Sequence, residues 1–268
     1  MNAISKSSAD YSPDAPEIPE LIKAILTEYS GIPEDEIVQH VQEVRDKGWK
    51  VFQYPCLGVY SFLNLRIVDA PQYQDVLQHV KNGATILDLG CCFGQMIRKL
   101  VFDGAPGENV TGSELEPTFV DLGYELFRDK QNLNAAFKTG DFFGADVGGL
   151  KGMSFDYIFA ASFFHIFTWE EQVEAMSRAV GLLKQKPGSM IFGWQTGSKT
   201  PRLRPHDAAR SGEMYSHNEQ SLEKLVSEVA EKTGVELSTK VDVVGRATSA
   251  DSQDDDEWRY MRFSITRC

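Results

Sequence analysis

Short apolar runs alternate with amphipathic stretches along most of the chain, and the spacing within each predicts its structure. Short apolar runs predict strands at residues 85–89, 109–113, 136–139, 155–160 and 189–194. Apolar residues at helical spacing predict helices over residues 95–102, 118–129, 169–183 and 221–232. Because strands and helices alternate in this order, we expect an α/β fold whose mostly parallel sheet carries helices on both faces.

Two later segments alternate apolar and polar residues one by one. They cover residues 235–244 and 259–266. Such alternation is typical of antiparallel strands at a sheet edge, where one face is buried and the other is solvated. We therefore expect a closing antiparallel hairpin, which a plain dinucleotide-binding sheet lacks.

The segment before the sheet has its own pattern. Its first residues are polar and include Pro13, which predicts a disordered start. Helical patterns over residues 18–29 and 34–47 follow, and we expect them to form a cap over the active site. The predicted division is a disordered start at residues 1–15, a helical cap at 16–80 and a core at 81–268. A substrate lid at about 196–218 lies within the core.

Composition narrows the class of protein. With 42% hydrophobic and 25% charged residues, the chain of 268 residues is typical of one globular α/β domain with additions. A formal net charge of −12 argues against a nucleic-acid partner, because phosphate binding needs clustered Lys and Arg. The N-terminus lacks the apolar core of a secretion signal and no apolar run has the length of a bilayer span, which predicts a cytoplasmic protein without a membrane partner.

Neither the cysteines nor the acidic residues form a recognisable metal site. The four cysteines show no zinc-type spacing. The acidic run at residues 251–257 lacks the glycine-punctuated pattern of a calcium loop, and we interpret it as a solvated loop. We therefore expect a reaction that uses no metal.

The most informative stretch is ILDLGCCFGQ at residues 86–95. It matches a buried strand with an acid, Asp88, near its end, then a tight turn that contains Gly90 and Gly94, then a helix. The small residues let a ligand approach the backbone, and the first free N–H groups of the helix point toward it. We interpret Cys91 and Cys92 as small apolar fillers of the turn. The stretch predicts a cradle for a nucleoside-bearing cofactor.

Three more candidate groups follow the carboxyl ends of successive strands, where open α/β sheets bind ligands. Glu114 is suited to accept hydrogen bonds from both hydroxyls of a ribose. Asp141 is suited to accept from an adenine amino group while the ring of Phe142 packs on the base. The fourth strand ends in an aromatic loop that carries His165.

Together these features resemble class I S-adenosylmethionine-dependent methyltransferases, from about residue 54 to the C-terminus. The resemblance implies a Rossmann-like fold with a seven-stranded sheet, S-adenosyl-L-methionine as cofactor and S-adenosyl-L-homocysteine as product. More narrowly, the chain is similar to a fungal subgroup in YPCLG at 54–58, LDLGCCFGQ at 87–95, DLGYELFRD at 121–129 and AASFFH at 160–165. Members of that subgroup act in secondary metabolism, several of them in polyketide–terpenoid (meroterpenoid) pathways, where they O-methylate a polyketide-derived acid or a related intermediate.

Carried over by position, the resemblance implies a set of cofactor contacts. These are Asp88, Gly90, Cys91, Gly94, Glu114, Leu115, Asp141, Phe142 and Ala160. The first strand and its turn hold the methionine end, Glu114 holds the ribose, and Asp141 with Phe142 holds the adenine. One departure is Cys92, which stands where the usual motif has a glycine. It fits the cradle if its backbone avoids a positive φ.

The expected reaction is O-methylation of a carboxylate or a hydroxyl. His165 is the candidate general base for a hydroxyl acceptor, and packing within its aromatic loop is the alternative interpretation. A carboxylate is already ionised and needs only orientation, most simply by a cation. The expected acceptor-binding residues are Tyr54, Phe62, Arg66, Trp169, Trp194, Arg202, Arg204 and Tyr215. The two lid arginines, together with His206, either bind an acidic acceptor or lie in a solvated loop.

Other functions stay open at this stage. An N- or C-methyltransferase, or a non-catalytic cofactor-binding partner, needs the same cradle. A nicotinamide-dependent oxidoreductase also uses a glycine turn and an acid after the second strand, but GCCFG at 90–94 lacks the full G-x-G-x-x-G pattern. The expected partner is a small molecule, with a homodimer as a candidate assembly.

Overall fold

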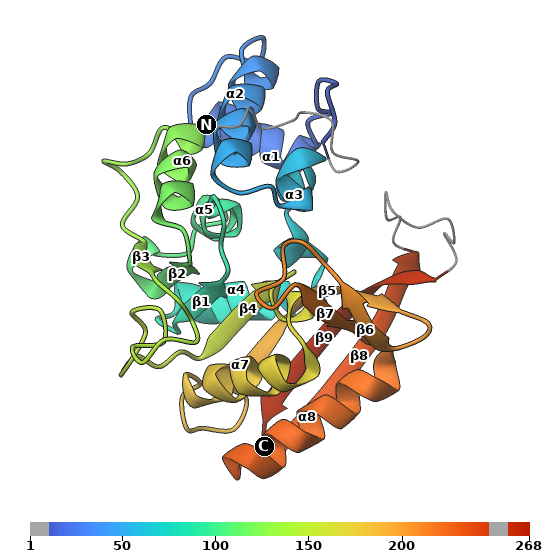
Figure 1. Cartoon of the computed structure of the whole chain (residues 1–268). Helices are drawn as coiled ribbons and strands as arrows, with labels where there is room; N and C mark the ends of the chain where they lie inside the picture. The colour runs from blue at the N-terminus through green and yellow to red at the C-terminus, as the bar shows by residue number, and fades with distance from the viewer. Residues whose placement is uncertain (1–10, 247–256) are drawn as a thin grey trace.

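One seven-stranded sheet organises the chain (Figure 1), in the order β3-β2-β1-β4-β5-β9-β8. The computed structural model describes residues 11–246 and 257–268. The strands of the sheet are β1 (Ile86–Leu89), β2 (Val110–Glu114), β3 (Ala136–Thr139), β4 (Tyr157–Ala161), β5 (Met190–Ser198), β8 (Leu237–Arg246) and β9 (Trp258–Arg267). The first five run parallel, and β9 runs antiparallel to both of its neighbours, β5 and β8, so the predicted Rossmann-like α/β class and its closing hairpin are confirmed.

Strand β5 is longer than its apolar run indicates. The prediction ended at residue 194, whereas the strand continues to Ser198. The extension follows from its neighbour, because β9 pairs with β5 from Met190 opposite Thr266 to Ser198 opposite Trp258. Long-range pairing therefore decides where this strand ends.

The helices that follow the strands and flank the sheet include α5 (Gln95–Phe102), α6 (Pro117–Phe127), α7 (Trp169–Gly181) and α8 (Glu219–Thr233). Local sequence sets where they begin. The Thr168 side chain accepts from the N–H of Glu171 in a capping box at α7, and Asn218 does the same at α8. Helices α7 and α8 pack together on one face of the sheet, and α5 and α6 cover the other face together with the cap (Figure 1).

The cap consists of several helical segments, most of them short, instead of the two helices that were predicted. Its helices are α1 (Glu20–Ala24), a π-helix η1 (Ile25–Tyr29), α2 (Ile37–Val51), α3 (Pro55–Gly58), the 3₁₀ turns η2 (Ser61–Leu63) and η3 (Arg66–Asp69), and α4 (Tyr73–Lys81). The short turns contain too few residues to show a helical period, which is why the pattern missed them. Among the described residues, no helix combines the length and apolar character needed to cross a membrane.

The expectation of a disordered start at residues 1–15 needs a correction at its end. Residues 1–10 lie outside the described part of the chain. Tyr11 is buried, and its hydroxyl donates to Asp46 at 2.8 Å, while Arg45 donates to the carbonyl of Ser12 at 3.1 Å. A buried arginine on α2 therefore fixes the chain before the first helix.

A two-stranded hairpin within the predicted lid segment was not expected. It consists of β6 (Arg202–Pro205) and β7 (Glu213–Ser216), paired antiparallel outside the main sheet. Its first strand reads RLRP, and two charges with a proline do not give the apolar alternation of a strand. Two 3₁₀ turns complete the fold, η4 (Gly107–Asn109) and η5 (Phe164–Ile166), and η5 packs against β5, α7 and the hairpin strand β7.

Candidate active site

The turn after β1 forms a tight backbone cradle. The N–H groups of Gly90 and Cys91 both donate to the carbonyl of Ser113 on β2 at 2.9 Å. Gly94 adopts a φ of 68° as it starts α5, and a Cβ there would lie 2.5 Å from Nη1 of Arg98. The two predicted glycines therefore meet backbone conformations or contacts that a side chain would obstruct.

The backbone of Cys92 does not avoid a positive φ, although the prediction required it to do so. Its φ is 51°, in the left-handed region. The Cys92 N–H donates to Oε2 of Glu114 at 2.8 Å, and this bond across two strand ends holds the turn in that conformation. Ser162, just after β4, also has a positive φ of 54°. Strained non-glycine residues thus follow two neighbouring strands, as they commonly do at functional sites.

Glu114 is buried, and within the described part of the chain its carboxylate accepts hydrogen bonds only from backbone N–H groups. Its Oε1 accepts from Leu115 at 2.8 Å and from Glu116 at 3.2 Å, and its Oε2 accepts from Cys92. Burial raises the pKa of Glu114, although these three N–H groups oppose that rise. The carboxylate lies within the cradle, where sequence reasoning predicted a ribose-binding acid.

Two buried polar atoms in the cradle have no partner. Oδ2 of Asp88 and Oε1 of Gln95 are enclosed and make no hydrogen bond among the described residues. Burial, reinforced by the neighbouring Glu114 carboxylate, raises the pKa of Asp88 to about 7. Enclosed acceptors without donors fit an ammonium or hydroxyl group of a ligand, so the residues present suit the amino-acid end of S-adenosylmethionine.

The side chain of Leu115 is the most exposed large apolar side chain in the described part of the chain, at 59%. It directly follows the ribose acid. An apolar side chain left open at this edge fits the face of a purine base. Leu115 thus lies at the same cradle edge as Glu114, and its predicted contact with the cofactor stays a prediction.

The predicted adenine acid is held by the hairpin. Both carboxylate oxygens of Asp141 accept from Nη1 of Arg210, at 2.8 and 3.0 Å, and Oδ1 also accepts from the N–H of Phe143. Partial burial raises the pKa of Asp141, but these donors outweigh it and the net shift is downward. The buried ring of Phe142 packs edge-on against Phe163, which joins this loop to the loop after β4.

Phe163 is a site residue that the sequence argument did not single out. A Cβ on Gly90 would lie 2.8 Å from its ring, so Phe163 covers the glycine turn. Its ring also packs on Phe167. In the sequence, Phe163 is marked only by its place in an aromatic loop that directly follows β4, whose last residues are the buried Ala160 and then Ala161.

His165 is buried in η5, and its Nδ1 makes no hydrogen bond to any residue that the structure describes. Burial, with a smaller contribution from the nearby His206, lowers the pKa of His165 to about 3. The imidazole is therefore neutral across the physiological pH range. A neutral ring with an unpaired nitrogen can form a hydrogen bond with a ligand oxygen.

Cap residues meet the end of β5 around Trp194. The guanidinium of Arg66 lies 5.1 Å from the Trp194 ring and 5.3 Å from the Tyr260 ring, and Arg262 lies 5.8 Å from the same indole. The Arg66 pair with Asp69 is long, at 3.6 Å. Two cations beside one buried indole make this end of β5 suited to an aromatic or anionic ligand.

Two predicted cap residues differ in their surroundings. Tyr54 is half-buried, and burial together with the nearby Glu114 carboxylate raises its pKa to about 12, which sets it beside the cradle. Phe62 is fully packed edge-on against Phe93 of the turn. Tyr54 therefore lies on the cofactor side, and Phe62 joins the cap to the core.

The remaining predicted acceptor residues lie on or beside the hairpin. Trp169 packs edge-on with Tyr215, on the α7–α8 side of the sheet rather than beside Trp194. Arg204 donates to Ser198 and Ser216 and pairs with Glu257 at 2.7 Å, so its guanidinium anchors the hairpin. Arg202 is exposed.

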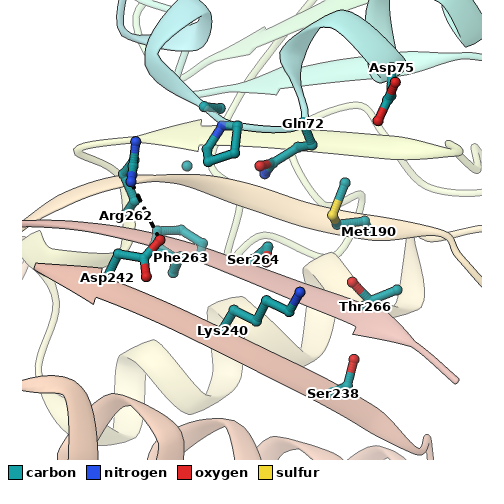
Figure 2. A pocket seen from close by; sticks show the side chains of 13 residues that line it. Gln72, Asp75, Met190, Ser238, Lys240, Asp242, Arg262, Phe263, Ser264 and Thr266 are labelled. Atoms are coloured by element: carbon teal, nitrogen blue, oxygen red, sulfur yellow. Dashed lines mark hydrogen bonds and ion pairs between the residues drawn. The ribbon is translucent and has the colours of Figure 1, made fainter. Parts of the chain in front are cut away.

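A separate polar cavity of about 340 Å³ opens between the start of α4 and the face of the sheet at β5, β9 and β8 (Figure 2). Lys240, Asp242 and Arg262 lie along it, and none of the predicted site residues lines it. No three potential metal-ligating side chains converge within residues 11–246 and 257–268. Of the acidic run at 251–257, only Glu257 is described.

Two family models match the chain. One is described as a meroterpenoid methyltransferase N-terminal domain and matches residues 10–63. The other is described as a methyltransferase domain and matches residues 86–186, which include the cradle and the loop after β4. The first match covers most of the cap and the second most of the parallel sheet.

Curated fungal proteins are similar over most of this chain. O-methyltransferase phiE of a fungal species is 39% identical over 225 residues, covering 82% of this chain and 74% of that protein. O-methyltransferase atr3 of Stereocaulon alpinum is 40% identical over 81% of this chain and 64% of its own length. Methyltransferase ausD of Penicillium brasilianum is 36% identical, covering 83% and 81%.

Solved structures share the fold. The N-terminal domain of EvdMO1, crystallised with S-adenosylhomocysteine bound, aligns with a TM-score of 0.51 at 13% identity. The alignment covers 74% of this chain and 85% of that one.

Proposed function

The chain belongs to this family of fungal methyltransferases and is S-adenosylmethionine-dependent, and from that premise we propose that it O-methylates a small polyketide-derived acceptor. Family membership removes two rival interpretations, a nicotinamide-dependent oxidoreductase and a non-catalytic cofactor-binding partner. The observation that carries the proposal is the cradle after β1, whose enclosed acceptors Asp88 and Gln95 lack donors of their own. A relative's name, O-methyltransferase, supports oxygen over nitrogen or carbon as the acceptor atom.

We assign the cofactor contacts along the carboxyl edge of the sheet. Asp88 and the turn at Gly90 and Gly94 hold the amino-acid end, Glu114 holds the ribose hydroxyls, and Leu115 packs on the base. Asp141 and Phe142 bind the adenine at the next strand. When bound, the cofactor supplies an electrophilic methyl group on a sulfonium.

The protein's own task is then positioning, because the leaving thioether needs no proton. Holding the acceptor in line with the methyl group in a water-poor site accounts for roughly 7–11 kcal/mol in favourable cases. We propose that the cap closes over cofactor and acceptor together. Arg66 and Trp194 bind the acceptor's ring or carboxylate, and His165 binds its reacting end.

The low basicity of His165 bears on the acceptor. A ring whose pKa is about 3 in the ligand-free protein is a weak base, so a phenol or alcohol acceptor must gain reactivity from its own acidity or from its surroundings. A carboxylate needs no base. This observation favours an acidic acceptor, and it supports orientation as the main role of His165.

Three finer proposals concern the whole chain. We propose residues 16–80 as the cap, 81–268 as the core and 196–218 as the substrate lid, which the hairpin β6–β7 supports. We propose a cytoplasmic location, which the free thiols of Cys56, Cys91 and Cys92 suit. We also propose a homodimer that pairs through the edge strand β8.

The test uses isotope-labelled cofactor and an organic extract of the source culture. We expect calorimetry to show binding of S-adenosylhomocysteine and none of NAD, and mass spectrometry to show one labelled product. Alkaline hydrolysis then separates a methyl ester, which loses the label as methanol, from a methyl ether, which keeps it. Label on nitrogen or carbon would contradict the proposed O-methylation.

A further inference from the structure

Gln195 is a buried amide without a hydrogen-bond partner. It is 2% exposed, and neither its Oε1 nor its Nε2 makes a hydrogen bond to any described residue. An unpaired buried amide is unfavourable, and in a native protein such a group calls for an explanation, such as a ligand that completes its bonds. In contrast, Nε2 of the buried Gln172 donates to the carbonyls of Phe167 and Tyr215, each at 2.9 Å.

The residue lies where the parallel part of the sheet ends. Ala161, the last residue of β4, is in register with Trp194, and the N–H of Ser162 donates to the Trp194 carbonyl at 2.7 Å. Gln195 is the next residue of β5 and lies opposite Met261 on β9. Because side chains alternate along a strand, Gln195 faces the α7–α8 side of the sheet, opposite to Trp194.

The turn η5 covers the same end and the same face. It packs on β5 and on the hairpin strand β7. Its Phe164 contacts Phe263, the register partner of Gly193, which is two residues before Gln195 on the same face. The next residue of η5 is His165, whose Nδ1 is also buried and unpaired. Two uncharged polar groups without partners thus occupy neighbouring elements beside the end of β4.

We propose that Gln195 and His165 together form the subsite that binds the acceptor oxygen to be methylated, an inference that rests on the proposed methyl transfer. With a hydroxyl acceptor, Gln195 donates from Nε2 to the oxygen, and the hydroxyl donates to Nδ1 of His165. The oxygen becomes strongly acidic as the ether forms, and its proton then leaves through this weakly basic nitrogen to solvent. The O–CH₃ bond forms as the methyl–sulfur bond breaks, with its electron pair left on sulfur. With a carboxylate acceptor no proton moves, and both side chains donate to it.

The sharpest test is the sign of a stability change. Gln195→Met keeps the approximate volume and removes an amide that has no partner in the ligand-free protein, so we expect the midpoint of thermal unfolding to rise by roughly 2–4 °C. The same variant should lose about 5- to 10-fold in kcat/KM with 2,4-dihydroxy-6-methylbenzoic acid, a phenolic acid that offers both acceptor groups. Binding of S-adenosylhomocysteine should stay at the wild-type level by calorimetry.

Gln172→Met is the matched control. Its amide is fully bonded, so its removal should lower the midpoint. A fall in the midpoint of Gln195→Met comparable to that of the control would overturn the proposal, because it would show that the Gln195 amide is satisfied within the protein. An unchanged kcat/KM would overturn it as well. Wild-type protein that binds S-adenosylhomocysteine but methylates neither this acid nor any extract component would instead contradict the proposed function.

Discussion

Single residues of the proposed cofactor and acceptor sites are held in unfavourable states in the ligand-free protein. Asp88 is enclosed without a donor, Cys92 has a left-handed backbone, and Gln195 keeps an unpaired amide. Each state is unfavourable in the free protein and acquires a reason once a ligand is bound.

Asp88 should make stability depend on pH in a predictable direction. An unfolded aspartate ionises near pH 3.8, whereas burial raises the pKa of the folded one to about 7. The stabilising contribution of the protonated acid is complete below pH 3.8 and is lost as the pH rises through 7, because the unfolded chain releases its proton first. The unfolding midpoint of Asp88→Asn, measured relative to that of wild type, should therefore be higher at pH 8 than at pH 5. The variant should also bind S-adenosylhomocysteine more weakly.

Thermal unfolding of both proteins at the two pH values measures this. The exposed Asp35→Asn is the control and should leave the difference between the two pH values unchanged. Parallel pH profiles for Asp88→Asn and wild type would show that the buried acid does not titrate in this range.

The amino-acid sequence indicated which residues form the cradle, but not the backbone conformation of its turn. Asp88, Gly90, Gly94 and Glu114 were singled out because, in combination, they lie at the carboxyl ends of successive strands, whereas each alone is a weak signal. The left-handed conformation of Cys92 was not predictable, since its φ depends on a bond to Glu114, 22 residues away. Gln195 carried no signal, because a glutamine in a strand gains meaning only when its partners are known to be missing.

At the scale of elements, the hairpin β6–β7 closes onto the adenine end of the site through one ion pair. Arg210 binds both oxygens of Asp141 and lies 4.6 Å over the Phe143 ring. The adenine amino group needs one of those oxygens in the proposed cofactor complex. The hairpin and the cofactor therefore compete for Asp141, and binding of one should loosen the other.

Arg210→Ala should consequently bind S-adenosylhomocysteine more tightly. The pair is about half exposed, so the expected gain is modest, about 2- to 5-fold at low salt, and smaller at high salt. Calorimetry at two salt concentrations measures it. Arg202→Ala, exposed on the same hairpin, is the control and should leave affinity unchanged. Weaker binding by Arg210→Ala would show instead that the hairpin clamps the bound cofactor.

Elements with strong periodicity were predictable, and those that depend on partners were not. Helix α5 and strand β3 occur at their predicted residues. In α5 the apolar residues recur at helical spacing, and the left-handed Gly94 marks its start. The extension of β5 depends on pairing with β9. The hairpin β6–β7 is stabilised by the Arg204 ion pair and two serine hydroxyls, none of which leaves a pattern in the sequence.

At the scale of the molecule, the sheet separates two apolar clusters and the site lies where they meet. One cluster joins the cap to α5, α6 and the turn after β1, and the other lies under α7 and α8 (Figure 1). The cap is tied to the core through Asp129, which accepts from Tyr29 of η1 and, on both oxygens, from the buried Arg98 of α5. Removing the cap would therefore expose the cradle's own core, which makes cap and core one cooperative unit.

The strand β8 ends the sheet and leaves one edge without a partner among the described residues. A strand edge of ten residues without proline is a template for pairing with another strand. Two copies paired antiparallel about Val241 place Lys240 opposite Asp242 of the other copy, twice. Both side chains are exposed along the cavity of Figure 2. This complementarity supports the proposed homodimer with a sheet continuous across a two-fold axis.

A charge exchange tests the pairing at the whole-molecule scale. Lys240→Glu sets like charges opposite each other at two positions, so we expect sedimentation velocity to show the dimer fraction falling several-fold at low salt. Adding Asp242→Lys to the same chain restores opposite charges in reversed order and should restore the dimer. Since neither residue belongs to the cradle, binding of S-adenosylhomocysteine should be the same in all three proteins. A wild-type protein that sediments as a monomer at every concentration, or a double variant that stays as dissociated as the single one, would rule out pairing through β8.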